Sequence, residues 1–574
     1  MRAFVICLMT VGLVISSARA RADGGDQQSS EATEDNTNRA HDAEAIRFAD
    51  EVTPSKSKDI WLEVEIQQLR DLVQNQAREL ESQRSTLRNA IAIQQQEIEQ
   101  LREELQVSRS GSGPLAAGRA SASVTPISAI SSASVVASSA SEPNQAAPQK
   151  PASPLSVRIG SAEFTPGGWV DFTSIFRTTN VGSGIGTSFG SVPFSNTTAG
   201  QLTETRFSPQ NSRFNLKITA KPGNFNVIGF LETDFVGLQP GNVFVTSNSN
   251  APRMRLYWVD VQRGRWEFLG GQSWSFLAPN RNGLSPLPND IFASLNVDPN
   301  LQVGLTWTRA PQFRIVFHPN EKWALGLAIE NPEQFIGGAV TLPSALTTSY
   351  SGQLDNGTLP STPNAHPDIL PKVAFDGHLG DRHMHIEAVG VVRSFKVFDP
   401  LSGSTSTSTG GGGSVNLNLE MFKNFHIIAN SFWSDGGGRY IFGLGPDVII
   451  RGDGAPSLVH SGSGIGGFEW QATPRNMLYS YYGVGYFQRN VTVDPATGKP
   501  VGFGYSGSSS SVNRAVQEPT FGYIRTLWKH ENYGGLQVLT QYSYLTRSPW
   551  FVAPGAPKNA HASMVYVDFR YLLP

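Results

Sequence analysis

Charge is scarce in this chain, and cysteine is nearly absent. Only 16% of the 574 residues are charged, whereas soluble proteins usually carry ~25% charged residues. The formal net charge of −2 lacks the basic excess that marks nucleic-acid-binding proteins. After residue 20 no apolar run is long enough for a membrane-spanning helix, so helical membrane spans are excluded.

Glycine and aromatic residues, in contrast, are abundant. The chain holds 57 Gly, 32 Phe, 14 Tyr and 11 Trp. Glycine supplies the backbone conformations of tight turns, and aromatic side chains suit the half-buried surface of a sheet. The composition therefore favours many short strands joined by turns over a helical enzyme.

The first 22 residues have the features of a secretory signal peptide. Arg2 gives a positive start, and residues 3–16 form an apolar core too short to span a bilayer. Small residues at 18, 20 and 22 provide cleavage sites. A buried N-terminal helix is the alternative. The only cysteine, Cys7, lies inside this leader, so we expect a mature protein without disulfides, thiol chemistry or cysteine-bound metal.

Three segments with different compositions follow the leader. Residues 23–59 are polar and predict disorder. Residues 60–107 predict a self-associating coiled coil with one stutter, with a single helix docked on a domain as the alternative. Residues 108–155 consist mainly of Ser, Ala, Gly and Pro and predict a linker. The heptad positions are Ile66, Val73, Leu80 and Leu87, and after a shift of four residues Ile91, Ile98 and Leu105.

From residue 156 to the end, alternation with a period of two replaces the helical pattern. Phe214 and its alternate neighbours are apolar, whereas Arg213 and Lys217 lie on the other face. The same rule opposes Glu232 and Asp234 to apolar residues. It also predicts that Met254, Leu256 and Trp258 face one way, opposite Arg253, Arg255 and Tyr257.

Sixteen strands are predicted in this body, and their connections alternate in length. Seven are turns of a few residues, such as Lys221-Pro222-Gly223, and eight are long. A sandwich has no reason to sort its connections in this way, whereas an outer-membrane barrel has short turns at one end and long loops at the other. With both ends of the body on the short-turn side, the coiled coil is expected in the periplasm. The predicted spans are 167–178, 205–221, 224–236, 252–263, 265–276, 301–318, 322–331, 369–379, 382–396, 412–422, 424–434, 457–472, 474–488, 516–529, 532–547 and 560–572.

Five short stretches, in this order and spacing, resemble the DcaP-like trimeric outer-membrane porins. The resemblance covers residues 210–333 and implies a sixteen-stranded trimeric porin with a periplasmic helical extension, which passes small, often anionic, organic solutes. The stretches are Leu231-Glu-Thr-Asp-Phe235, Arg253-Met-Arg-Leu-Tyr-Trp-Val-Asp260, Gly270-Gly-Gln-Ser-Trp-Ser275, Arg309-Ala-Pro-Gln-Phe-Arg314 and Ala328-Ile-Glu-Asn-Pro332.

Motifs of enzymes occur only in unsuitable contexts. The G-x-S-x-G pattern at residues 186–190 lies in a Gly/Ser loop without the helix that a nucleophile elbow needs. The dinucleotide-type pattern at residues 462–467 lies on a predicted strand. His383 and His385 share one face of a strand, with His378 nearby. A metal site there is the alternative to polar residues of the barrel lumen, which we favour.

The charged residues predict where the pore is narrow. Loop 277–300 is the third long connection and is expected to fold into the lumen, stiffened by its prolines and seated on the wall through Phe292 and Leu295. A cap at the surface is the alternative. Residues of this loop expected on its water side are Asn280, Arg281, Asn282, Asp290 and Asp298, and residues expected to point inward from the strands are Arg213, Lys217, Glu232, Asp234, Arg253, Arg255 and Arg314.

The sequence thus predicts an all-β transmembrane barrel of sixteen antiparallel strands, preceded by a helical coiled coil. The expected function is passive diffusion of small hydrophilic solutes through the outer membrane, with anions favoured because arginine is in surplus at the constriction. A structural anchor that uses the coiled coil, with peptidoglycan as a hypothetical partner, and a barrel-borne hydrolase are the alternatives. We expect a homotrimer in contact with outer-membrane lipid, and no cofactor, metal or nucleic acid.

Overall fold

The computed structural model describes residues 153–237 and 250–574. The predicted leader, the polar segment, the coiled coil and nearly all of the linker lie outside the described residues. The predicted body, 156–574, forms a closed antiparallel barrel of sixteen strands, as the alternation predicted. Among the described residues, no helix is long and apolar enough to cross a membrane.

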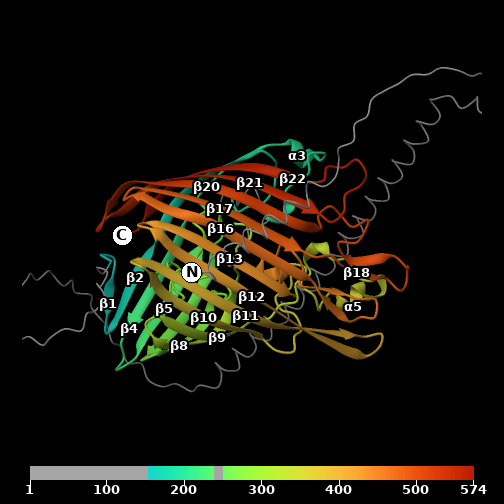
Figure 1. Cartoon of the computed structure of the whole chain (residues 1–574), viewed down its shortest axis with the longest axis horizontal. Coiled ribbons are helices and arrows are strands. Elements are labelled where there is room, and N and C mark those ends of the chain that lie inside the picture. Colours follow the sequence, from blue (N-terminus) through green and yellow to red (C-terminus); the bar gives the residue numbers. More distant parts are fainter. Residues whose placement is uncertain (1–152, 238–249) are drawn as a thin grey trace, which may run out of the picture. The chain divides into compact units, whose positions relative to one another are not determined.

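Neighbours in the chain are neighbours in the barrel throughout. Each barrel strand pairs with the one before it, and β22 returns to pair with β2, which closes the sheet (Figure 1). The short strands β3 and β4 both pair with β2 and together occupy the position of the second barrel strand. The strands are β2 (Ala162–Arg177), β3 (Glu204–Ser208), β4 (Arg213–Ala220), β5 (Asn226–Asp234), β6 (Arg253–Arg263), β7 (Trp266–Trp274), β8 (Arg309–Asn320), β9 (Trp323–Glu330), β10 (Asp368–Leu379), β11 (Arg382–Asp399), β12 (Ser404–Phe422), β13 (Phe425–Asp435), β16 (His460–Thr473), β17 (Asn476–Phe487), β20 (Asn513–His530), β21 (Gly534–Pro549) and β22 (Ala560–Leu572).

A short strand completes the junction between the first and last barrel strands. β1 (Val157–Ile159) pairs with the start of β2, beyond the point where β22 ends. The Ser153 hydroxyl donates to the Pro574 carbonyl at 2.9 Å, and the Leu573 amide donates to Gly168 at 3.0 Å. Both ends of the barrel domain therefore lie at the end with the short turns, which we call the turn end. The opposite end is the loop end.

The connections at the loop end carry small elements of their own. Two hairpins pair outside the barrel sheet, and the helices are all single turns. They are β14 (Val448–Ile450) with β15 (Pro456–Leu458), β18 (Asn490–Val493) with β19 (Pro500–Phe503), α3 (Thr198–Gln201), α5 (Thr347–Tyr350), η1 (Phe189–Ser191), η2 (Gly337–Ala339), η3 (Ser344–Leu346) and η4 (Gly438–Tyr440). Figure 1 shows α5 and β18 at the end away from the C-terminus.

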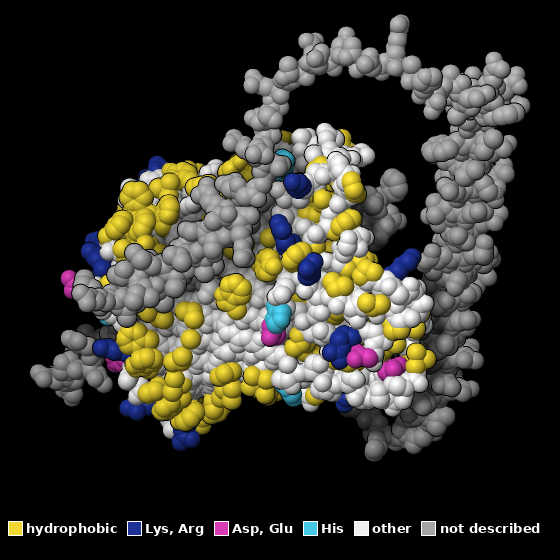
Figure 2. Space-filling view, turned by 45° about the vertical axis from the view of Figure 1, so that its right-hand side comes forward, with side chains coloured by type: hydrophobic (Ala, Val, Ile, Leu, Met, Phe, Trp, Pro, Cys, Tyr) yellow, Lys and Arg dark blue, Asp and Glu magenta, His cyan; other side chains and the backbone are white. Residues whose placement is uncertain are grey.

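The barrel carries its apolar residues outside and its polar residues inside. On β22, Val565, Val567 and Phe569 are exposed by 42–51% on the outer face, whereas Asp568 between them is fully buried. Figure 2 shows the exposed hydrophobic side chains gathered over the part of the body nearer the turn end. This pattern is the inverse of a soluble protein and suits a barrel surrounded by lipid.

Two predicted strand starts differ from the observed ones by eight residues, and β2 begins at Ala162 rather than at 167. Residues 301–308 do not extend β8, because their backbone contacts the inner wall of the barrel instead: the Val303 amide donates to Glu518 at 2.9 Å. In the other direction, β12 begins at Ser404 rather than at 412, so the predicted loop 397–411 is only a turn between two long strands. Local polarity at 404–411 suggested a loop, but pairing with β11 determines the structure.

The predicted alternation fails at one position of β6. Between Met254 and Leu256 the register shifts relative to β5, so that Arg255 has no partner of its own. Met254 is exposed by 57%, but Leu256 and Trp258 are buried and therefore point inward, opposite to the prediction. A β-bulge inserts one residue and reverses the faces of all residues after it. Arg253 and Arg255 precede the reversal, and both lie on the inner face.

Candidate functional site

The connection between β7 and β8, residues 275–308, crosses the barrel lumen. Its backbone amides are bound by side chains from strands far around the wall. Asn280 donates to Glu387 of β11 at 3.0 Å, and Val297 donates to Gln541 of β21 at 3.1 Å. Between these points, the Leu295 amide donates to the hydroxyl of a tyrosine on β17. The predicted infolding of loop 277–300 is therefore observed, and its span is longer than predicted.

Two of the charged residues of the infolded loop, Arg281 and Asp298, are bound to the wall. Arg281 was expected on the water side, but its guanidinium forms two bonds of 2.8 and 3.0 Å to Glu469 of β16 and lies 5.1 Å from the Phe292 ring. Asp298 is buried and accepts from the Tyr566 hydroxyl at 2.7 Å. Asn280 is buried as well, whereas Asn282 is exposed and Asp290 half-buried.

The start of the loop is held by an ionic cluster on β10 and β11. Lys372 donates to the Ala278 carbonyl at 2.9 Å and pairs with Glu387 at 3.0 Å. His385, a candidate metal ligand in the sequence, is fully buried and has a carboxylate at each ring nitrogen: Asp376 at 2.8 Å and Glu387 at 3.2 Å. These carboxylates also accept loop amides. The cluster thus works as an anchor for the loop.

In another part of the wall, arginines of β4 and β6 gather around two carboxylates of β5. Arg255 bonds to both Glu232 and Asp234 at 2.7 Å, and Arg253 binds Asp234 at 2.8 Å. Arg213 lies 3.9 Å from Glu232. Arg253 and Arg255 make the closer pairs, so three guanidinium groups surround two acids and leave a positive excess.

Arg314 and Lys217, the other two cations predicted to point inward from the strands, differ in their surroundings. Arg314 is buried beneath the infolded loop, donates to the Leu284 carbonyl at 3.4 Å and lies 4.5 Å from the Phe276 ring. It therefore supports the loop instead of lining open space. Lys217 is half-buried on the inner face of β4, opposite Phe230, and no ion pair of Lys217 is found among the described residues.

Tryptophan rings extend the arginine cluster along the wall. Arg213 and Arg570 both lie against the Trp169 ring, at 4.5 and 5.0 Å. Arg255 and Arg309 both lie near the Trp274 ring, at 5.7 and 5.9 Å. A ring face attracts a cation and keeps two guanidinium groups in place without neutralising them. Arg570 is bound by Asp171 at 2.6 Å and by Asp568 at 3.3 Å. The positive excess of this wall therefore lies between β4 and β8, at Arg213, Arg253, Arg255 and Arg309.

A cavity of about 410 Å³ opens at the loop end beside this wall. Arg309 contributes a guanidinium with one nitrogen, Nη1, that is buried without a hydrogen-bond partner. Glu333 is the acidic residue of the cavity lining. Burial raises the pKa of the Glu333 carboxyl above its ordinary value, while nearby Arg439 acts in the opposite direction. The lining residues are Trp307, Thr308, Arg309, Ala310, Pro311, Asn331, Glu333, Phe335, Arg439, Phe442 and Gly443.

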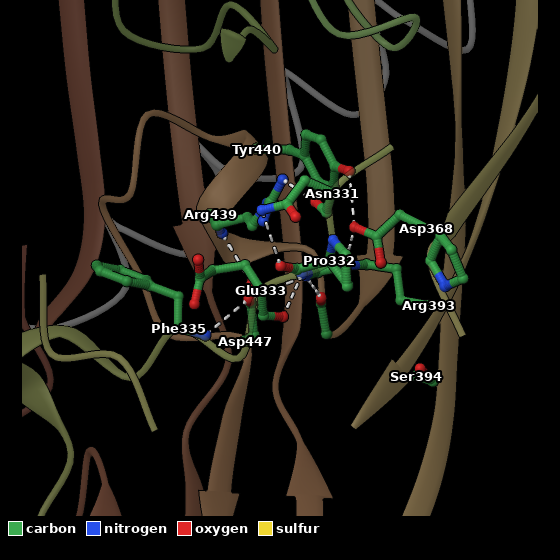
Figure 3. Close-up of polar contacts among 12 residues, drawn as sticks. Asn331, Pro332, Glu333, Phe335, Asp368, Arg393, Ser394, Arg439, Tyr440 and Asp447 are labelled. Atoms are coloured by element: carbon green, nitrogen blue, oxygen red, sulfur yellow. Dashed lines mark hydrogen bonds and ion pairs between the residues drawn. The ribbon is translucent and has the colours of Figure 1, made fainter. Parts of the chain in front are cut away.

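The loops around this cavity are fixed by Arg393 of β11. Figure 3 shows its guanidinium among Asp368, Asp447 and Tyr440. It pairs with Asp368 at 3.0 Å and with Asp447 at 2.9 Å, and all three side chains are fully buried. It also donates to the Glu333 carbonyl at 2.7 Å. One residue of the wall therefore holds both loops that border the cavity.

Alternation along the strands does not reveal the roles of several of these residues. Arg309 lies at the first position of β8, where the strand ends and regular alternation is lost. Lys372 and Arg393 are ordinary inward polar residues of their strands, and only the fold shows which loops they bind. Glu469 follows the same rule on β16.

Comparisons with known proteins agree with this architecture. No protein-family profile matches the chain, and no curated protein matches it in sequence. Among solved structures, the chain is similar to the outer membrane channel DcaP of Acinetobacter baumannii, with a TM-score of 0.52 and 16% identity over 72% of this chain and 98% of that one. The expected resemblance is thereby confirmed at the level of the fold.

Other porins are more distant. An anion-selective porin from Comamonas acidovorans has a TM-score of 0.40 and 12% identity, over 72% of this chain and 100% of that chain. OmpF of Salmonella typhi has a TM-score of 0.41 and 8% identity, over 73% of this chain and 100% of that one.

Proposed function

We propose that this protein is an outer-membrane porin through which small hydrophilic, mainly anionic, solutes diffuse passively. The observation that carries this proposal is the positive wall of arginines facing the infolded loop 275–308. Selectivity in wide pores arises from charged side chains near the narrowest point. Arginine binds carboxylates through two parallel hydrogen bonds, so carboxylates gain most from such a wall.

The individual arginines should contribute unequally to selectivity. The Arg255 side chain is only 5% exposed and is bound by two carboxylates, so it stabilises the wall more than it meets solute. Arg253 is 30% exposed. No ion pair of Arg309 is found among the described residues, and this residue lines the cavity at the loop end. Arg253 and Arg309 are therefore the cations that we expect a passing anion to meet.

Reversal potentials in planar bilayers under a KCl gradient test this function. The wild-type protein should show discrete conductance steps and an anion preference. Combined Arg253→Gln and Arg309→Gln should lower the anion-to-cation permeability ratio by roughly twofold or more. Arg451→Gln, in an exposed pair with Asp453 at the loop end, is the matched control and should leave the ratio unchanged. A silent or cation-selective pore contradicts the proposal.

Assembly and orientation belong to the same proposal. We infer a homotrimer whose contacts lie on the first strands, residues 167–276, with the turn end in the periplasm beside the coiled coil. Strand length supports the β4–β7 part of this side: these strands have 8–11 residues, whereas β2, β11, β12 and β20 have 16–19. Short strands cover less of the bilayer thickness. A side of the barrel built from them therefore suits burial against neighbouring copies.

A further inference from the structure

The outer surface of the barrel has an apolar cup near the turn end. It has a volume of about 370 Å³ and is formed by β6, β7, β8 and the turn before β5. Phe268 pairs with Ile315 across β7 and β8, and Phe268 is 50% exposed on the outer face. The cup therefore opens outward, away from the lumen. Its lining is Phe225, Val261, Arg263, Trp266, Phe268 and Ile315.

One cation stands at the edge of this apolar cup. Arg263 is the last residue of β6, is exposed, and has its guanidinium 5.0 Å from the Phe225 ring. No ion pair of Arg263 is found in the described part of the chain. A long side chain of this kind lays its apolar stem on the surface and presents its charge at the water interface.

Basic residues surround the barrel at the same level. Each short turn carries Lys or Arg in it or directly beside it, and three of these turns also carry an acidic residue, namely Glu321, Asp381 or Glu531. Figure 2 shows Lys and Arg along the rim beyond the hydrophobic band. Such a rim matches the level of lipid phosphates at one face of a bilayer. The rim residues are Lys221, Arg263, Arg265, Lys322, Arg382, Lys423, Arg475 and Lys529.

We propose that the cup binds one anionic phospholipid of the periplasmic leaflet. The phosphate pairs with Arg263 and the adjacent Arg265, and part of one acyl chain fills the space against Trp266, Phe268 and Ile315. The assignment rests on the proposed function in its orientation, with the turn end in the periplasm. All cup residues except Ile315 lie within residues 167–276, so the proposed contact between copies must leave this turn-end edge of β6 and β7 open to lipid. Five of the six lining residues are apolar, which suits an acyl chain and does not suit a glycan strand of the cell wall. A helix is about 10–12 Å wide with its side chains, too wide for a cup of this size.

Native mass spectrometry of the full-length protein with added phosphatidylglycerol tests this site. The wild type should retain one lipid per chain, and phosphatidylcholine should compete poorly. Arg263→Gln should weaken retention roughly fivefold, since one cation near the phosphates is lost. Lys423→Gln removes a rim cation far from the cup, at the β12–β13 turn, and should retain the lipid as the wild type does. Phe268→Ala probes the acyl chain and should also weaken retention.

Three outcomes would overturn the proposal. Equal retention in the Arg263 and Lys423 variants would mean that the rim attracts lipid without a site. Dissociation of an oligomer on Arg263→Gln would assign the cup to a contact between copies. Loss of binding to soluble peptidoglycan fragments, with lipid retention unchanged, would assign it to the cell wall. Single-channel conductance of the same variants should stay at the wild-type value, so a failure of the porin function is detected separately.

Discussion

The Arg393 guanidinium lies between two fully buried carboxylates, and removal of its charge would leave both without a counter-ion. An uncompensated buried charge costs about 3–5 kcal/mol. We therefore expect Arg393→Gln to lower the free energy of unfolding by that amount, measured by urea titration in lipid, and to expose loop 436–459 to protease. Arg451→Gln breaks a pair whose side chains are 51% and 62% exposed and should change little. Equal effects of the two variants would contradict this role of Arg393.

Glu333 should make the anion preference depend on pH. Because burial raises the pKa of this carboxyl, it takes up its proton at a higher pH than an ordinary glutamate with a pKa of about 4.3. Acidification then removes the negative charge from the cavity while the arginines stay charged. The anion preference should rise as the pH falls from about 7 to about 4.3, the ordinary pKa of a glutamate.

A substitution separates this effect from other carboxylates. Glu333→Gln should show the higher anion preference already at neutral pH and should lose most of the rise on acidification. Reversal potentials of both proteins at both pH values provide the measurement. An unchanged pH dependence in the variant would assign the titration to another group.

At the residue scale, the sequence predicts which side of the barrel wall a side chain lies on better than it predicts which residue that side chain binds. Alternation placed Arg213, Glu232 and Asp234 inward because a strand has a period of two. It failed for Leu256 and Trp258, because a bulge depends on pairing with the neighbouring strand and has no signal within β6 itself. The binding of Arg281 to Glu469 joins positions 188 residues apart, and local patterns contain no information on such contacts.

At the scale of elements, the strands were predictable and the loops only in part. The alternation and the sorting of connection lengths reflect the barrel geometry directly, and β22 has the predicted bounds. Residues 301–308 look like a strand because they are apolar, but they serve to bury the end of the infolded loop against β13 and β20, as shown by the bond from Thr306 to Asn430. Apolarity alone does not reveal which surface a segment contacts.

Deletion of residues 280–296 should widen the pore. This change removes the middle of the infolded loop together with the Arg281–Glu469 pair. We expect single-channel conductance to increase roughly twofold, since the loop fills much of the lumen cross-section. The deletion of residues 554–557, in the exposed β21–β22 loop, is the control and should not alter conductance. No increase in the first variant would reject the loop as the constriction.

At the scale of the whole molecule, the proposed trimer links the barrel to the predicted coiled coil. The heptads at 60–107 include glutamines at core positions, among them Gln76 and Gln83, and polar layers weaken helix association. The barrel walls must then contribute contact area as well. Deletion of 60–107 should therefore lower the temperature at which the trimer dissociates, without loss of the folded barrel.

Native mass and semi-native electrophoresis over a temperature series measure this effect. Deletion of residues 113–148 from the linker removes 36 residues, against 48 for the heptad segment, without touching the heptads, and serves as the control. It should leave the dissociation temperature close to that of the full chain, because a flexible linker contributes only a slowly varying entropy term. A wild-type protein that is monomeric by native mass would reject the trimer. Equal dissociation temperatures in both deletions and the full chain would assign assembly to the barrel walls alone.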